Sequence, residues 1–174
     1  NRARADLRVG LPVVLTGAGG AALFLAAEGL APARLGDLRT LGAPVLALTA
    51  RRAETLKIAA YDGDLVRLEL PAEADVAWVR AMADPAQDLD HPMKGPFRAL
   101  RGGTADLARV ALQTVKLAHL LPAILMVPMG QDAAQALDPG LTRLEAGLLQ
   151  ADLAGLSDFH PVAAARVPLA ASQA

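Results

Sequence analysis

Residues 104 to 129, TADLARVALQTVKLAHLLPAILMVPM, constrain the fold more than any other stretch of this chain. Apolar side chains recur at helical spacing through the first part of the stretch, so one face of the helix would be buried. We expect Thr104 to cap this helix and Pro122 to end it. The apolar run from Ala123 to Val127 is typical of a strand buried on both faces of a sheet. The stretch therefore predicts a helix–strand unit of an α/β layer fold.

Composition restricts the class of protein. The chain has 174 residues, enough for one domain, and is 53% hydrophobic but only 3% aromatic. Its 17 basic and 18 acidic residues give a net charge of −1, which argues against a nucleic-acid or anionic-membrane partner. Cysteine is absent, which excludes disulfides and thiolate zinc sites and fits a reducing compartment. We therefore expect a cytoplasmic protein that binds neither nucleic acid nor membrane.

The remaining elements follow from periodicity and from turn residues. Helices are expected at residues 2–8, 32–41, 49–56, 74–82 and 141–156. Strands are expected at residues 11–15, 44–48 and 65–70, the last half-exposed because its polar and apolar residues alternate. Loops are expected at residues 84–103 and 130–140, whereas residues 21–28 suit either a strand or a helix.

The turn from Thr16 to Gly20 allows two interpretations. A strand followed by Gly17-x-Gly19-x-x-Ala22, with Asp37 further on, is similar to a dinucleotide-binding fingerprint. The alternative is a glycine-rich hairpin turn between two strands. The hairpin is favoured because a helix precedes the first strand and because Asp37 lies within a predicted helix.

No residue stands out as a metal ligand or a catalytic group. The three histidines lack the spacing of a metal site: His91, His119 and His160. His119 lies where a cation would favour the carboxyl end of the central helix. Two acidic pairs, Asp62/Asp64 and Asp88/Asp90, lie in turn segments where aspartate commonly bonds to the backbone. We therefore assign no catalytic, cofactor-binding or metal-binding residue.

Several segments, in the same order along the chain, resemble 3,4-dihydroxy-2-butanone 4-phosphate synthase, the riboflavin-pathway enzyme that acts on ribulose 5-phosphate. They are DLRVGLPVVL, LFLAAE, MADPAQDLDHP with PFRALRGG, LAHLLPAILMV and QADLAGL. The resemblance implies an α/β fold with a mixed sheet flanked by helices, and a homodimer.

The chain departs from that family at its working positions. The family has an acidic loop, DDEDRENEGD, that supplies a magnesium-binding glutamate, where this chain has Thr16 to Gly20. Its catalytic helix begins with Gly-His-Thr-Glu, and residues 106–109 here are DLAR, with Leu107 in place of the ligand histidine. A glutamate in the following strand is replaced by Pro128. The resemblance thus implies a domain that is inactive as a synthase and holds no cofactor.

The last residues, HPVAAARVPLAAS, resemble the junction at which fused riboflavin proteins continue into GTP cyclohydrolase II. We therefore expect a synthase-like domain at residues 1–157 and a linker at 158–174. The expected partners are a second copy and a C-terminal cyclohydrolase domain in the same chain, and zinc is expected only in that domain. The predicted function is a non-catalytic, structural or regulatory domain of a GTP cyclohydrolase II-type protein. The alternatives are a small-molecule or nucleotide-phosphate binding module using the Gly17–Gly20 turn and, ranked last, an enzyme of altered chemistry.

Overall fold

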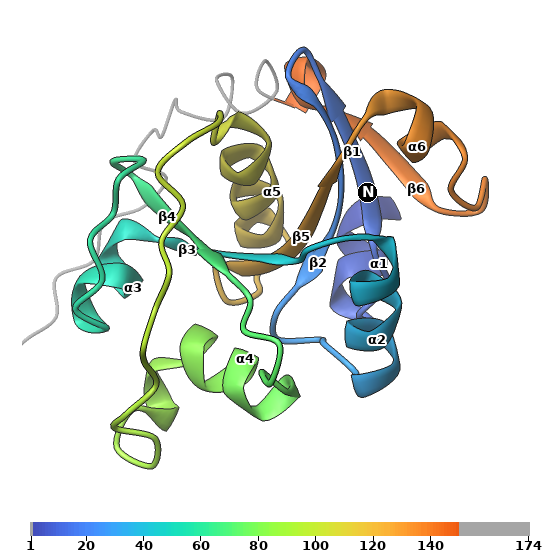
Figure 1. Ribbon diagram of the computed structural model, residues 1–174. Coiled ribbons are helices and arrows are strands. Elements are labelled where there is room, and N and C mark those ends of the chain that lie inside the picture. The colour runs from blue at the N-terminus through green and yellow to red at the C-terminus, as the bar shows by residue number, and fades with distance from the viewer. Residues whose placement is uncertain (1, 150–174) are drawn as a thin grey trace, which may run out of the picture.

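A computed structural model describes residues 2–149 and shows one mixed sheet between two layers of helices (Figure 1). The six strands lie in the order β4-β3-β5-β2-β1-β6. Their bounds are β1 Val13–Gly17, β2 Gly20–Ala26, β3 Val45–Thr49, β4 Leu65–Glu69, β5 Ala123–Met129 and β6 Thr142–Glu145. The helices are α1 Arg2–Arg8, α2 Pro32–Leu41, α3 Ala50–Thr55, α4 Val76–Ala83, α5 Asp106–Leu117 and α6 Gln131–Gln135, with a 3₁₀ turn, η1, at Pro85–Gln87. This architecture confirms the predicted mixed sheet flanked by helices.

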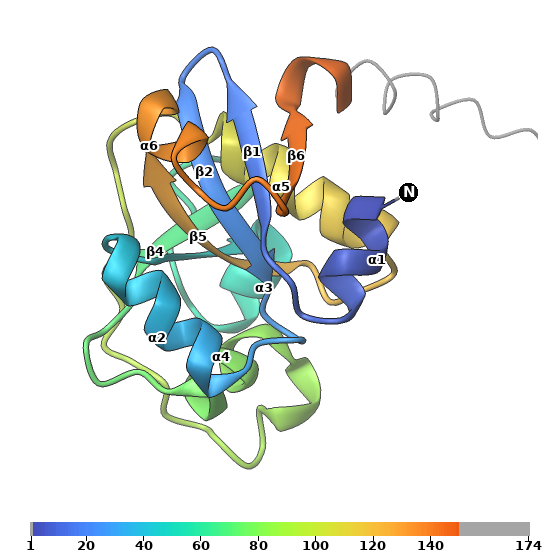
Figure 2. The same cartoon turned by 90° about the vertical axis from the view of Figure 1, so that its right-hand side faces the viewer.

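The two faces of the sheet carry separate hydrophobic cores. Helices α1 and α5 cover one face, and α2, α4 and α6 contribute to the other (Figure 2). Successive side chains of β2 alternate between these cores: Leu23 and Leu25 face α2, whereas Phe24 faces α5. Strand β2 is therefore buried on both sides, and residues 21–28, which the sequence left open, are mainly strand.

Several sequence predictions are confirmed at or near their bounds. The helices at 2–8 and 32–41 coincide with α1 and α2. Helix α3 begins after Thr49, whose hydroxyl accepts a hydrogen bond from the backbone N–H of Arg52 at 3.3 Å. The strands at 44–48 and 123–127 correspond to β3 and β5. These segments have either strong caps or continuous apolar runs, which local sequence shows well.

The ends of the central helix differ from the prediction. Helix α5 begins after Ala105, so Thr104 lies one residue before the N-cap, where its hydroxyl accepts from the N–H of Asp106 at 3.1 Å. The helix ends at Leu117, and His119 adopts a left-handed conformation with φ of 58°. The helix therefore stops before Pro122, at a left-handed residue typical of helix ends.

Strand β4 is not half-exposed, as its alternating residues had suggested. Only Glu69 is exposed, and the charged side chain of Arg67 is buried. The strand's outer edge is covered by the segment around Ala99, since the N–H of Glu69 donates to the Arg98 carbonyl and the N–H of Leu100 to the Arg67 carbonyl. The predicted loop at 84–103 thus protects a sheet edge.

The region after β5 contains the largest errors of the sequence-based prediction. Helix α6 lies in the predicted loop at 130–140, and β6 replaces the start of the helix predicted at 141–156. Strand β6 pairs in parallel with β1, and helical structure begins only at residues 146–149. The rest of that predicted helix and the predicted linker at 158–174 lie outside the described residues. Between residues 2 and 149, no helix is long and apolar enough to cross a membrane.

Candidate functional site

A pocket of about 300 Å³ lies where the β1–β2 turn, the end of β5 and the start of α5 meet. We call it the α5 pocket. It is lined by Gly19, Ala21, Val45, Arg67, Leu100, Gly103, Thr104, Leu107, Ala108, Met126, Pro128 and Met129. The tertiary structure thus brings together Leu107, Pro128 and the glycine-rich turn, three places at which the sequence differs from the motifs of the family that it resembles. We therefore take the α5 pocket as the candidate site.

Arg67 is the only ionisable side chain among these lining residues. It is 8% exposed, and its Nε and Nη2 donate to the two carboxylate oxygens of Asp62 at 2.8 and 2.9 Å. The guanidinium also donates to the carbonyls of Gly102, Gly103 and Thr104 at 3.0 to 3.3 Å. Arg67 therefore fastens the loop before α5 to the sheet, with its charge offset by Asp62.

The β1–β2 turn packs directly against the start of α5. A Cβ atom at Gly17 would lie 3.1 Å from Leu107 Cδ2 and 3.3 Å from Ala146 Cβ. A Cβ atom at Gly19 would lie 3.2 Å from Thr104 Cγ2. These glycines therefore permit a close approach of the turn to α5.

This arrangement contradicts the dinucleotide interpretation. Strands β1 and β2 are antiparallel neighbours, and Gly17 pairs directly with Gly20. A dinucleotide fingerprint requires the glycines to open a helix whose N–H groups face a pyrophosphate. Asp37 lies in α2 and lines a different pocket, beside Leu38 and Leu41. The hairpin interpretation is confirmed.

Arg109, at the position of the family's glutamate, is absent from the pocket lining. Its guanidinium binds both carboxylate oxygens of Asp64 at 2.7 and 2.8 Å and one oxygen of Asp106 at 3.0 Å. The hydrogen bonds from Arg109 lower the pKa of the Asp64 carboxyl, and Asp64 in turn raises the pKa of Arg109. This exposed ion pair joins α5 to the turn before β4 rather than serving the pocket.

A second charged group was not foreseen from the sequence. Arg52, Asp88 and Lys94, here called the Asp88 cluster, form a partly buried ion-pair network away from the α5 pocket. Arg52 contacts both oxygens of Asp88 at 2.6 and 2.7 Å, and Lys94 Nζ lies 2.6 Å from one of them. Both basic residues lower the pKa of the Asp88 carboxyl far below its usual range, the hydrogen bonds from Arg52 most. The only local clue was the turn around Asp88, which indicates no partner.

Three of the four aspartates in the two acidic pairs form ion pairs with basic side chains. Asp62, Asp64 and Asp88 each bind a basic side chain. His91 and His119 lie outside any cluster of metal-binding side chains: in residues 2–149, no group of three His, Asp or Glu residues could hold a metal ion. His160 lies outside the described residues.

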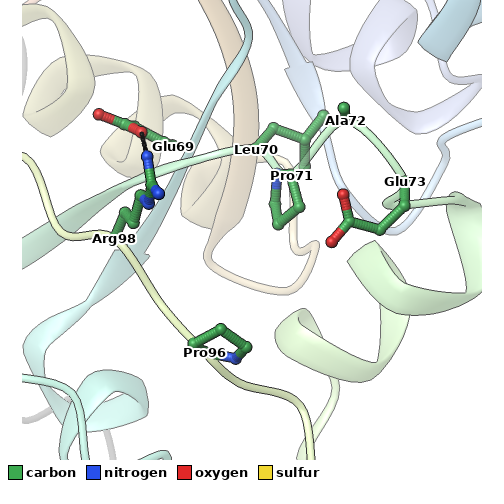
Figure 3. Close-up of a pocket in the computed structure, with 7 residues that line it drawn as sticks. All are labelled: Glu69, Leu70, Pro71, Ala72, Glu73, Pro96 and Arg98. Atoms are coloured by element: carbon green, nitrogen blue, oxygen red, sulfur yellow. Dashed lines mark ion pairs between the residues drawn. The ribbon is translucent and has the colours of Figure 1, made fainter.

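A more polar pocket of about 340 Å³ lies at the end of β4 (Figure 3). Figure 3 shows Arg98 pointing toward Glu69, with Glu73 further along the chain beyond Pro71. The Arg98–Glu69 ion pair is 4.0 Å long, and the two side chains are 86% and 54% exposed. Such a pair is solvated and weak, so we do not regard this pocket as the functional site.

Comparison with known proteins shows which sequences and folds this chain is similar to. No protein-family model matches the chain. The chain is 31% identical to GTP cyclohydrolase-2 of Azospirillum brasilense over 185 aligned residues, which cover 99% of this chain and 47% of the relative. It therefore spans about half the length of the curated relative that it matches.

The solved structures show which fold this is. A cation-free 3,4-dihydroxy-2-butanone 4-phosphate synthase superposes with a TM-score of 0.65 at 16% identity, over 88% of this chain and 96% of the other. A synthase in complex with two magnesium ions gives a TM-score of 0.61 at 15% identity, over 88% and 95%. The chain therefore has the fold of 3,4-dihydroxy-2-butanone 4-phosphate synthases, and in sequence it is similar to about half of a GTP cyclohydrolase-2.

Proposed function

We propose that this chain is a non-catalytic, dimerising domain of a GTP cyclohydrolase II-type protein of riboflavin biosynthesis in the cytoplasm. One observation carries the proposal: the pocket in the position of the synthase active site has no free acid or base among its lining residues. Its single ionisable side chain, Arg67, is paired with Asp62 and bound to three carbonyls. General acid–base chemistry needs a group that can take up or release a proton near neutral pH, and a paired guanidinium cannot.

The residues of the α5 pocket do not fit magnesium. That ion requires near-octahedral coordination by oxygen ligands, usually including carboxylates. Leu107 and Pro128 occupy two of the positions that the family uses for ligands or catalysis, and neither side chain has an oxygen. Thr104 contributes the only side-chain oxygen of the lining, and its hydroxyl is 2.6 Å from Asp106. We therefore derive no magnesium-dependent step for this domain.

The role that we propose for this domain is structural. The packing of the β1–β2 turn on α5, which the family uses to bring reacting groups together, is kept here through Gly17 and Gly19. A domain with this frame can still hold two copies together and carry a fused second domain. The relative's greater length leaves room for such a domain, in which zinc and GTP chemistry would reside.

An activity assay tests the main proposal. The 174-residue chain is incubated with ribulose 5-phosphate and magnesium, and formation of formate is followed, with an active synthase as positive control. We expect no turnover above the rate without protein. Magnesium-dependent turnover that disappears on chelation would refute the non-catalytic role.

Sedimentation equilibrium tests dimerisation separately. We expect a mass twice the 17.9 kDa of the single chain. A monomer at all concentrations would remove the dimerising part of the proposal and leave the non-catalytic part to the assay.

A further inference from the structure

We propose that the α5 pocket binds a small, uncharged molecule with an apolar body and one hydrogen-bond acceptor. This inference goes beyond the proposed function and does not depend on it. A non-catalytic domain with or without dimerisation could possess such a site.

The size and walls of the pocket support an apolar ligand. Its volume is about 300 Å³, whereas an apolar cavity of about 150 Å³ already accommodates benzene. Side chains of Leu107, Met126, Pro128 and Met129 supply the wall on the side of α5 and β5. Methionine side chains adapt to the shape of an apolar guest and contact aromatic rings favourably. The body of the ligand is therefore expected to be hydrocarbon or aromatic.

One buried donor indicates the polar end of the ligand. Each terminal nitrogen of a guanidinium carries two N–H groups. Arg67 Nη2 binds Asp62 and two carbonyls, but Nη1 has a single partner among the described residues, the Thr104 carbonyl at 3.1 Å. Arg67 is 8% exposed and forms part of the pocket wall. Arg67 Nη1 can therefore donate one further hydrogen bond, and a ligand carbonyl or hydroxyl oxygen in the pocket would accept it.

The charges around the pocket favour a neutral ligand over an anion. Asp62 offsets the charge of Arg67 through two hydrogen bonds, so the guanidinium is not a free cation. Asp106 in the first turn of α5 offsets the positive end of that helix. No carboxylate lines the pocket to pair with a cationic ligand. An ion entering the pocket would lose its hydration without gaining a counter-ion, which costs free energy.

Matched probes test this inference on the full chain. Benzamide has an aromatic ring and a neutral acceptor, toluene lacks the acceptor, and benzoate replaces it with an anion. Each is titrated into the ¹⁵N-labelled protein, and the amide shifts of Gly19, Gly103 and Leu107 are followed. We expect saturable binding of benzamide with a Kd on the order of 1 mM. Toluene should bind about fivefold more weakly and benzoate at least about tenfold more weakly.

Variants and contacts within the complex locate the binding site. Leu107→Phe narrows the pocket at the start of α5 and should weaken benzamide binding about threefold or more. Val9→Phe, a similar change at a 71% exposed position outside the pocket, should leave it unchanged. If Leu107→Phe does not fold, NOEs from benzamide to the methyl groups of Met126 and Met129 in the unmodified protein provide the same information. The inference is overturned if benzamide does not saturate at its solubility limit, if benzoate binds as tightly, or if the NOEs fall elsewhere.

Discussion

The α5 pocket and the Asp88 cluster show two opposite uses of buried space in one domain. The α5 pocket brings together the positions that differ from the motifs of the resembling family, and its walls are mostly apolar and its one charge is paired. The Asp88 cluster lies away from that pocket and buries Arg52 and Lys94 to 6% side-chain exposure around a single carboxylate. The charges of the Asp88 cluster thus hold a loop in place, whereas the α5 pocket has no free acid or base among its lining residues.

The Asp88 cluster holds its loop in place because its charged and polar groups make many hydrogen bonds to neighbouring elements. Arg52 donates to Asp88 and to the carbonyls of Met82 and Ala81 at 2.7 and 2.9 Å. The backbone carbonyl of Lys94 accepts from the indole N–H of Trp78 at 3.1 Å. The cluster therefore binds the loop after η1 to both α3 and α4. A catalytic charge must be able to change partners, and these groups cannot do so without unfolding the loop.

The largest effect is expected from Arg52→Ala. The substitution leaves two buried carbonyls without their donor and Asp88 with Lys94 as its remaining partner, so the free energy of unfolding should fall by about 2–4 kcal/mol. Urea denaturation measures it. Arg51→Ala is the matched control, because Arg51 is the adjacent arginine with 89% side-chain exposure, and its effect should stay within about 0.5 kcal/mol. Equal effects of the two substitutions would mean that the Asp88 cluster does not stabilise the fold.

Gly17→Val tests the packing of the pocket region. The new side chain would collide with Leu107 and Ala146, so we expect a loss of about 1–3 kcal/mol in the free energy of unfolding. The same change at Gly36, within α2 and with nothing within 4 Å of its added Cβ, should be neutral or slightly stabilising. Thermal denaturation of both variants measures the difference. If Gly17→Val proves neutral, the turn does not pack on α5 as described.

Acid titration tests how strongly Arg52 and Lys94 stabilise the carboxylate of Asp88. The pKa of Asp88 is lowered in the folded state, so its stabilisation is complete above about pH 4, the pKa of an unfolded aspartate, and declines as the pH falls toward the lower folded-state value. The stability difference between the wild type and Asp88→Asn should therefore shrink by about 1–2 kcal/mol between about pH 6 and pH 3. Urea midpoints across this range measure it. A constant difference would show that the carboxylate of Asp88 is not preferentially stabilised by Arg52 and Lys94.

The smallest effect is expected from Arg109→Ala. Arg109 binds Asp64 and Asp106, but the side chains are 32%, 55% and 70% exposed, so water and salt screen the interaction. We expect a loss of about 0.2–1 kcal/mol, reduced further in about 1 M salt. Urea denaturation at low and high salt measures it. A salt-independent loss of stability as large as that of Arg52→Ala would mean that the Arg109 ion pairs stabilise the fold as strongly as the Asp88 cluster.

The sequence by itself determined the elements whose signals are local. Pro32 and Gly42 bound α2, Thr49 caps α3, and the apolar run at 123–127 forms a central strand. Each of these signals involves residues that are near one another in the chain, so no tertiary contact is needed to recognise it. The differences at Leu107 and Pro128 from the motifs of the resembling family are likewise visible without a structure.

Only the tertiary structure decided the features that depend on distant partners. Leu144 lies at helical spacing from Leu141 and Leu148, yet parallel pairing with β1 makes Thr142–Glu145 the strand β6. Arg67 lies in an alternating run typical of a half-exposed strand, but Asp62 and the carbonyls of residues 102–104 allow it to be buried. Intrinsic propensity is weak compared with strand pairing and with the cost of an unpaired buried charge. The α5 pocket depends on the same kind of long-range contact, because residues far apart in the chain form its walls, and periodicity cannot show this.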